Sequence, residues 1–373
     1  MRILSVVGAR PNFMKVAPII KAFRAYGDTF EQILVHTGQH YDEQLSASFF
    51  RDLDLRAPDV NLEVGSGTQA EQTAKVMLGF EPVCRNFAPD LVIVVGDVNS
   101  TLACSLTAKK LGVEVAHVEA GLRSGDMDMP EEINRRCVDT ISDYLFTTDR
   151  MANANLANEG IPESKVHFVG NVMIDTLLMF REQAAELRYH EQLGLKAGEY
   201  ATLTLHRPSN VDDLATLNRI LRTMKCISGN LPIVFPAHPR TRTKIEEFGF
   251  ASYFESGRIQ MIDPLGYLEF LSLNASAQAV FTDSGGLQEE TTILGVPCIT
   301  LRENTERPIT ISEGTNQLVG SDPNAIFEAF NQAQGKARTT PPSPEKWDGQ
   351  AAERIAAQFA GGFSVPLQVR QAS

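Results

Sequence analysis

The stretch Leu91-Val-Ile-Val-Val-Gly-Asp97, followed by Asn99-Ser-Thr101, decides the fold of this chain. Five consecutive apolar residues are typical of a strand buried on both faces of a parallel sheet, and the polar residues after Gly96 indicate a turn and the start of a helix. The second half of the chain repeats this arrangement in Ala279-Val-Phe-Thr-Asp283, which precedes Ser284-Gly-Gly286. The two segments predict one parallel sheet in each half.

Outward from these two segments, short apolar runs alternate with amphipathic runs along the chain. This alternation predicts βαβ units and an α/β fold with two doubly wound parallel sheets, whose strands end at a ligand-binding cleft. The expected strands are Arg2–Val7, Gln32–Thr37, Leu91–Val95, Glu114–Val118, Tyr144–Thr147, Val166–Val169, Tyr200–Leu205, Ile233–Phe235, Arg258–Ile262, Ala279–Thr282 and Cys298–Leu301. The expected helices include Ser100–Leu111, Glu131–Ile141, Asp213–Ser228, Tyr267–Asn274 and Asp322–Gly335.

The domain junction is expected near residue 172. A strand ends at Gly170-Asn171, and a long helical run, Met173–Leu193, follows it before the second set of strands begins. We therefore expect a first domain over residues 1–172 and a second over 173–347. A proline-rich segment at 339–344 precedes one more helix, Asp348–Ala360, which the pattern alone assigns to neither domain.

Composition excludes several classes of protein. The 373 residues include 34 Lys+Arg and 46 Asp+Glu, a net charge of −12, which argues against nucleic-acid binding and against a polybasic membrane anchor. Five cysteines without a CxxC pair argue against a disulfide framework and a cysteine-ligated zinc. The apolar N-terminus is interrupted too early for a signal peptide, and no run approaches the ~18 apolar residues of a membrane span, so we expect a cytoplasmic protein.

The first strand leads into Gly8-Ala-Arg-Pro-Asn12, which matches neither the dinucleotide fingerprint nor the GK[ST] phosphate-binding loop. Pro11 suits the first turn of a helix, and Arg10 and Lys15 lie near that helix N-terminus. Backbone donors, the helix dipole and two cations together favour an anion site. The alternative is that both side chains are solvated surface charges.

Three acids lie at strand or helix ends on the same predicted face: Asp97, Glu119 and Glu131. Clustered carboxylates suit a metal site or an acid–base site, and because we find no firmer metal-ligand set we expect acid–base chemistry and no metal. Glu131 and its neighbour Glu132 have a simpler explanation as well, since acids in a first helical turn stabilise the unpaired backbone amides there.

In the second half, His206-Arg207 follows a strand, and His238 takes the same place after the next one. A histidine in this position is an acid–base group or a phosphate contact. Ser284-Gly-Gly286 at a helix start suits a phosphate, because bare backbone lets the anion approach the amides. Glu290, one turn further on, suits ribose hydroxyls, and Arg307 follows the last strand as another anion contact.

Seven motifs in order resemble one family, the non-hydrolysing UDP-N-acetylglucosamine 2-epimerases. They are Gly8-Ala-Arg-Pro11, Gly96-Asp97, His117-Val-Glu-Ala-Gly-Leu-Arg123, Pro130-Glu-Glu132, His206-Arg207, Asp283-Ser-Gly-Gly-Leu-Gln-Glu-Glu290 and Thr305-Glu-Arg-Pro308. The resemblance spans about residues 1–320. It implies two Rossmann-like domains in the glycosyltransferase B arrangement, with the last helix (about 348–370) joining the first domain. It also implies a homodimer that supplies an activated sugar for surface polysaccharide.

The resemblance implies roles for individual residues. Positions that contact the nucleotide or phosphates match Arg10, Lys15, His206, Ser284, Gly285, Gly286, Glu290 and Arg307, and a uracil-side position matches Phe270. The catalytic carboxylates match Asp97, Glu119 and Glu131, with His206 as a proton donor at the diphosphate. Gln39 and His40 match a region associated with a second, regulatory UDP-sugar in bacterial members.

The reaction implied by the resemblance is 2-epimerisation of UDP-N-acetylglucosamine through UDP elimination to a glycal and re-addition, without a cofactor. Departures from the family pattern, such as Ala9, Asn12 and Ile309, leave open a related UDP-2,3-diacetamido uronate sugar as substrate. Other rivals are a hydrolysing epimerase, a glycosyltransferase of the same fold and a UDP-sugar sensor without activity.

Overall fold

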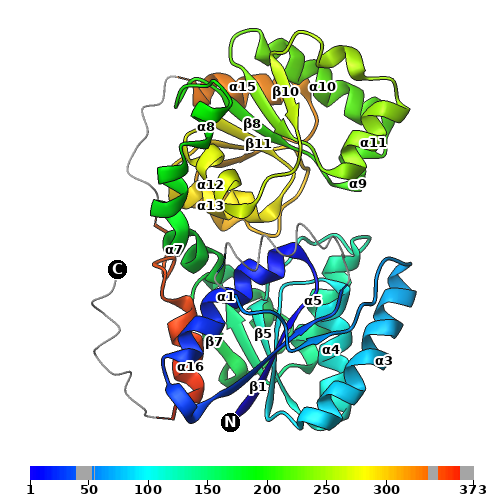
Figure 1. The fold of residues 1–373 in the computed structure, drawn as a ribbon, viewed down its shortest axis with the longest axis vertical. Coiled ribbons are helices and arrows are strands. Elements are labelled where there is room, and N and C mark those ends of the chain that lie inside the picture. Colours follow the sequence, from blue (N-terminus) through cyan, green and yellow to red (C-terminus); the bar gives the residue numbers. More distant parts are fainter. Residues whose placement is uncertain (39–52, 54, 335–342, 362–373) are drawn as a thin grey trace. The chain divides into compact units, whose positions relative to one another are not determined.

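The computed structural model describes residues 1–38, 53, 55–334 and 343–361, and the chain divides into two compact units. The first comprises Met1–Thr176 and the chain from Glu345 onward, and the second comprises Leu177–Pro344. Each unit is built on its own parallel β-sheet with helices on both faces (Figure 1). The predicted α/β class with two doubly wound sheets is therefore confirmed.

Unit 1 holds a seven-stranded sheet with the order β3-β2-β1-β4-β5-β6-β7. Its strands are β1 (Arg2–Val7), β2 (Glu31–His36), β3 (Val60–Asn61), β4 (Leu91–Val95), β5 (Glu114–Ala120), β6 (Tyr144–Thr147) and β7 (Val166–Phe168). The chain runs outward in one direction from β1 and then returns to pair β4 with β1. The strand order reverses between β1 and β4, and the loops that follow these two strands diverge there. Folds of this kind bind ligands at the carboxyl ends of such strands.

The helices of unit 1 cover both faces of its sheet. They are α1 (Arg10–Arg24), α3 (Gln69–Phe87), α4 (Asn99–Lys110), α5 (Pro130–Ile141), α6 (Arg150–Asn158), the first part of α7 (Val172–Leu187) and α16 (Ala351–Phe359). Helices α1 and α16 lie side by side (Figure 1), and the rings of Phe23 and Phe359 are 6.2 Å apart. On the other face, apolar residues of α3 and α4 pack against β1, β2, β4 and β5.

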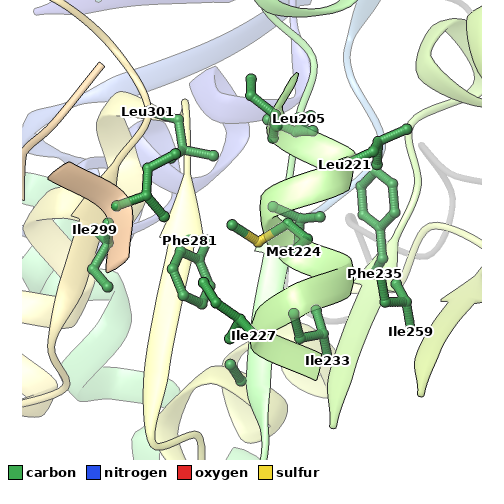
Figure 2. Close-up of a cluster of buried hydrophobic side chains, with 14 of the residues drawn as sticks. Leu205, Leu221, Met224, Ile227, Ile233, Phe235, Ile259, Phe281, Ile299 and Leu301 are labelled. Atoms are coloured by element: carbon green, nitrogen blue, oxygen red, sulfur yellow. The ribbon is translucent and has the colours of Figure 1, made fainter. Parts of the chain in front are cut away.

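Unit 2 holds a six-stranded sheet with the order β10-β9-β8-β11-β12-β13. Its strands are β8 (Ala201–Thr204), β9 (Ile233–Pro236), β10 (Ile259–Ile262), β11 (Ala279–Thr282), β12 (Cys298–Thr300) and β13 (Asn316–Leu318). Its helices, after the second part of α7, are α8 (Tyr189–Gln192), α9 (Pro208–Val211), α10 (Leu214–Ser228), α11 (Pro239–Glu247), α12 (Tyr267–Ala275), α13 (Gly285–Leu294), α14 (Ile309–Ser312) and α15 (Pro323–Ala333). Figure 2 shows the core of this unit, where Met224 and Ile227 of α10 face Phe281 of β11.

Three local features differ from the sequence-based expectation. Strands β3 and β13 were not expected, because each is only two or three residues long and carries polar residues. The expected helical run Met173–Leu193 is wrong as a single helix, since Arg188 has φ of +43° and separates α7 from α8. Strand β5 continues past Val118 to Ala120 through a register shift.

None of the described helices is both long enough and apolar enough to cross a membrane.

Candidate active site

In unit 1, Lys15 on α1 meets Glu119 near the end of β5, beside the loop that follows β1. Asn12 shapes the first of these loops, because its Oδ1 accepts hydrogen bonds from the backbone N–H of Gly8 (3.1 Å) and Ala9 (2.8 Å). One helical turn on, the Lys15 ammonium forms an ion pair with the Glu119 carboxylate. Only 6% of Lys15 and 2% of Glu119 is exposed, so Lys15 is not a solvated surface charge.

Glu119 has an unusual backbone for a residue with a side chain. Its φ is +69°, in the left-handed region, at the register shift between β5 and β6. Non-glycine residues in this region cost about 1–3 kcal/mol and tend to occur at functional sites. Its Oε2 faces Lys15, whereas its buried Oε1 has no hydrogen-bond partner in the part of the chain that the structure describes. One carboxylate oxygen is thus anchored and the other is buried and unpaired among the described residues.

Asp97 follows β4 and is tied to α5. Its carboxylate forms an ion pair with Arg135, and its backbone carbonyl accepts a hydrogen bond of 2.8 Å from Asn134 Nδ2. An ideal Cβ placed on the preceding residue, Gly96, would lie 3.7 Å from Glu119 Oε2, so Asp97 and Glu119 lie at the same edge of the sheet. The structure therefore brings together two of the three predicted carboxylates.

The adjacent acids Glu131 and Glu132 differ in burial. Glu132 is fully buried, pairs with Arg135 at 2.8 Å and accepts a hydrogen bond of 2.9 Å from the backbone N–H of Ser124. Burial alone would raise the pKa of Glu132, but these hydrogen bonds and the Arg135 charge hold it below its usual range. Glu131 is half-buried in the same first turn of α5. Arg135 and Asn134 of this helix contact Asp97.

In unit 2, His206 is oriented by Asp283. The His206 Nδ1 lies 2.8 Å from Asp283 Oδ1, and the backbone N–H groups of His206 and Arg207 also donate to this carboxylate. Burial alone would raise the pKa of Asp283, but His206 and the backbone donors hold it below its usual range. With 42% of its side chain exposed, His206 is accessible to a ligand through Nε2.

Three arginines surround one buried carboxylate near the start of α13. Glu306 forms ion pairs with Arg307 and with Arg302 (2.8 Å), and Arg207 lies 3.8 Å away. Burial would raise the pKa of Glu306, but the three guanidinium groups around it hold it well below its usual range. An ideal Cβ on Gly285 would lie 2.7 Å from Glu306 Oε1, so the cluster touches the first turn of the helix. Cations beside a helix N-terminus suit an anion.

Glu290 is a different kind of acid. Burial and the neighbouring Glu289 raise the pKa of Glu290 to about 8, so it carries a proton at neutral pH. It interacts with the buried hydroxyl of Tyr267 on α12. A protonated carboxyl can donate as well as accept a hydrogen bond, which suits the hydroxyl groups of a sugar.

The remaining predicted residues are placed as follows. Ser284 is the N-cap residue of α13, with Gly286 in the first turn, and Phe270 is half-buried on α12. His238 caps α11, where its Nδ1 accepts from the Arg240 N–H at 3.3 Å. Arg10 begins α1, but its side chain lies outside the described part of the chain, as do Gln39 and His40. Among the described residues, no group of three or more His, Cys, Asp or Glu is arranged to hold a metal ion.

Sequence reasoning missed the partners of the predicted residues. Arg135 was not singled out, although its spacing from Glu132 is that of an ion pair on one helix face. The pairing of His206 with Asp283 follows from the register of β8 and β11, in which Thr204 is opposite Thr282. Nothing in the local sequence indicated that Glu306 would be buried among arginines.

Comparisons with known proteins point to one family. A family model described as UDP-N-acetylglucosamine 2-epimerase matches residues 23–360. The UDP-N-acetylglucosamine 2-epimerase of Methanococcus maripaludis is 43% identical over 333 residues, which are 88% of this chain and 90% of the relative. The UDP-2,3-diacetamido-2,3-dideoxy-D-glucuronate 2-epimerase of Pseudomonas aeruginosa is 41% identical over 365 residues, 96% of this chain and 99% of the relative.

A solved structure is similar over almost the same length. The crystal structure of the Methanocaldococcus jannaschii UDP-GlcNAc 2-epimerase in complex with UDP-GlcNAc and UDP has a TM-score of 0.88 and 41% sequence identity. The match covers 96% of this chain and 99% of that one.

Proposed function

This chain belongs to the UDP-N-acetylglucosamine 2-epimerase family, and on that premise we propose that it interconverts UDP-N-acetylglucosamine and UDP-N-acetylmannosamine without hydrolysis. The observation that carries the proposal is the family match over residues 23–360, reinforced by relatives of that name over nearly the full chain. The groups of residues described above, one in each unit, are consistent with it. Unit 1 offers the buried carboxylate of Glu119 and the half-buried carboxylate of Asp97, and unit 2 offers an anion site beside a protonated acid.

The first chemical step is departure of UDP from C1. The C2 hydrogen of the sugar is not adjacent to a carbonyl, so direct proton removal is difficult. If the C1–O bond breaks first, UDP takes the electron pair and an oxocarbenium-like sugar remains. Arg307 and the Ser284–Gly286 helix start are proposed to hold the diphosphate, because preorganised donors stabilise developing charge. His206 Nε2 would donate a proton or a hydrogen bond to the leaving group.

In the second step a carboxylate removes the C2 proton, which leaves a C1–C2 double bond in a glycal. UDP then adds back at C1 as a proton returns to the opposite face of C2. Because the proton leaves one face of C2 and returns to the other, two different side chains are needed. We assign the base and the acid jointly to Asp97, Glu119 and Glu131. The unpartnered Oε1 of Glu119 supports its place among them, because a general base needs an oxygen within reach of the substrate.

The remaining roles follow from the resemblance for Arg10, Lys15, Phe270 and Glu290, and from a position directly after a strand for Arg207 and His238. Arg10, Lys15, Arg207 and His238 are proposed to assist at the phosphates, Phe270 to contact the uracil and Glu290 to hydrogen-bond the ribose. In this structure the Lys15 ammonium is engaged by Glu119. Lys15 would therefore act on the phosphates and on the base together, as a cation shared between them.

The test is turnover of UDP-N-acetylglucosamine in heavy water, followed by proton NMR of the sugar C2 position. The expected result is loss of the C2–H signal in both UDP-sugars as they equilibrate. Epimerised product that keeps hydrogen at C2 would contradict the glycal route. Free N-acetylmannosamine with UDP would indicate a hydrolysing enzyme, and transfer to an added acceptor with C2 unlabelled would indicate a glycosyltransferase.

A second substrate is favoured by one comparison. The relative named for UDP-2,3-diacetamido-2,3-dideoxy-D-glucuronate is 41% identical over 96% of this chain. This identity is close to the 43% of the UDP-N-acetylglucosamine 2-epimerase of Methanococcus maripaludis. The two sugars differ at C3 and C6, neither of which is a reacting carbon. Parallel assays with both UDP-sugars separate the candidates, and the preferred substrate is the one with the higher kcat/KM.

We also propose that the protein acts as a homodimer in the cytoplasm and supplies an activated sugar for surface polysaccharide. The dimer and the role in polysaccharide supply rest on the resemblance alone, and the cytoplasmic location also on the composition of the sequence. Light scattering at working concentration tests the dimer, for which about 82 kDa is expected from the 41.0 kDa chain.

A further inference from the structure

The chain at the end of β4 is held by side chains at three consecutive backbone carbonyls. Val95 O accepts from Thr101 Oγ1 (2.9 Å) and Asn12 Nδ2 (3.2 Å). Gly96 O accepts from His117 Nε2 at 2.8 Å, and Asp97 O accepts from Asn134 Nδ2 at 2.8 Å. Most buried carbonyl oxygens accept a hydrogen bond from a backbone N–H group. Side-chain donors at three consecutive carbonyls are therefore a specific feature of this turn.

His117 is the central donor of this set. It lies on β5, its side chain is completely buried, and its Nε2 must donate because a carbonyl oxygen can only accept. Its other nitrogen, Nδ1, is 2.7 Å from Asp139 Oδ1 on α5. Asp139, also fully buried, uses Oδ2 to accept from the backbone N–H of Gly121 at 3.0 Å and to bind Arg123 at 2.8 Å. Asp139 thus fixes the orientation of the imidazole.

The peptide that His117 binds belongs to a glycine in the left-handed region of backbone conformation. Gly96 has φ of +68°, and its N–H donates to Val118 O at 3.0 Å. Strand β5 therefore holds Gly96 from both sides, through Val118 and through His117. Gly96 in turn is the residue directly before Asp97 and packs against the Lys15–Glu119 ion pair. Movement of this one peptide would shift both carboxylates.

We propose that His117, oriented by Asp139, is a positioning residue that fixes the Gly96 peptide and thereby aims Asp97 and Glu119 at the substrate. This role rests on the proposed function. The competing explanation is that His117 merely satisfies buried polar groups, in which case its loss would lower stability and leave the geometry of catalysis in the folded protein unchanged.

Two substitutions distinguish the contribution of the Nε2 contact of His117 from that of its Nδ1 contact. In His117→Gln the amide nitrogen lies about where Nε2 was, and the donation to Gly96 O is kept. In His117→Asn the amide lies about where Nδ1 was, so the contact with Asp139 is kept and Gly96 O loses its donor. For a positioning role, we expect His117→Asn to lower kcat ~100-fold and His117→Gln to lower it less than ~5-fold, with KM within ~3-fold of wild type in both.

A matched control is Asp143→Asn. Asp143 also uses its carboxylate to bind a backbone N–H of β5, that of Val115 at 2.8 Å, but at the opposite end of the strand, and it pairs with Lys109. Its loss should lower the melting temperature with little change in kcat. Melting curves show which variants fold, and if His117→Asn does not, Asp139→Asn serves in its place, with a loss of kcat expected again.

The outcomes are distinct. Equal kcat in the folded His117→Asn and His117→Gln variants, or an effect confined to KM, overturns the positioning role. So does a loss of kcat in Asp143→Asn as large as that in His117→Asn. A wild-type protein without epimerase activity on either UDP-sugar would contradict the proposed function instead, and the two failures are thereby told apart.

Discussion

Glu131 and Glu132 are adjacent acids in the first turn of α5, yet one is half-buried and the other fully buried. If Glu131 belongs to the chemistry, Glu131→Gln should lower kcat at least ~100-fold, as should Asp97→Asn and Glu119→Gln. UDP binding, measured by calorimetry, should persist in all three. Retained activity in Glu131→Gln would remove that residue from the catalytic set.

Glu132→Gln is the matched contrast to Glu131→Gln. It removes the carboxylate that pairs with the buried Arg135, and breaking a buried ion pair costs about 3–5 kcal/mol. We therefore expect a clearly lower melting temperature for Glu132→Gln and almost none of that loss for Glu131→Gln.

Glu290 makes stability depend on pH in an unusual direction. Burial raises the pKa of Glu290 from 4.5 to about 8, so between these values the folded protein holds a proton that the unfolded chain has released. The unfolding free energy contributed by this group therefore falls as pH rises from about 4.5 to about 8. Glu290→Gln, which is neutral throughout, should weaken that fall.

The measurement is denaturant unfolding of both proteins at pH 6 and pH 8. We expect wild type to lose more free energy of unfolding between the two pH values than the variant, by an amount on the order of 1–3 kcal/mol. The same change with pH in both proteins would contradict the assignment.

Single residues also show where sequence reasoning stops. It was predictable that Asp97 and Glu119 lie at the carboxyl edge of one sheet and His206 at that edge of the other, because parallel strands end there. Their partners were not predictable. Lys15 and Glu119 are 104 positions apart, and only the packing of α1 against the sheet brings them into contact. The sequence indicated Lys15 as a cation for phosphate, whereas its burial with Glu119 depends on tertiary structure.

At the scale of elements, the start of α13 requires a small residue. An ideal Cβ on Gly285 would lie 2.9 Å from Arg307 Cζ and 2.7 Å from Glu306 Oε1, and both side-chain ends would have to move. Because these are ends of flexible side chains, Gly285→Ala should displace the Arg307 guanidinium more than it destabilises the helix. We expect KM for the UDP-sugar to rise ~10-fold with kcat changed less.

Gly286→Ala tests the neighbouring position in the same turn of α13. It should raise KM less than Gly285→Ala does. A larger effect at Gly286 would mean that backbone approach by the ligand, and not the position of Arg307, sets affinity.

Elements were predictable where burial is continuous. Leu91–Val95 and Ala279–Thr282 form strands with the expected bounds, because an apolar run inside a parallel sheet leaves little choice of register. Strands β3 and β13 lie at sheet edges, where only one neighbour is needed and polar residues are tolerated. The break between α7 and α8 depends on the left-handed Arg188, a residue type that gives no turn signal.

At the scale of the whole molecule, one buried acid fastens the returning end of the chain to unit 1. Asp175 lies on α7, directly before the boundary between the units at Thr176 and Leu177. Its carboxylate accepts from the backbone N–H groups of Ala351 (3.2 Å) and Ala352 (2.7 Å), the first residues of α16. Its neighbour Thr176 donates to Met14 O in α1. The outgoing and returning segments are thus fastened together inside unit 1.

Asp175→Ala should release α16 from this attachment. Two buried backbone donors would lose their acceptor, at a cost of about 1–3 kcal/mol each. Because α16 packs against α1, we expect faster amide hydrogen exchange in both helices and unchanged exchange in α10 of unit 2. A matched control is Asp322→Ala, which removes a single exposed cap of α15, from the Ala325 N–H at 3.0 Å, and should cost only ~1 kcal/mol. Unchanged protection of α16 in Asp175→Ala would show that apolar packing alone holds the last helix on unit 1.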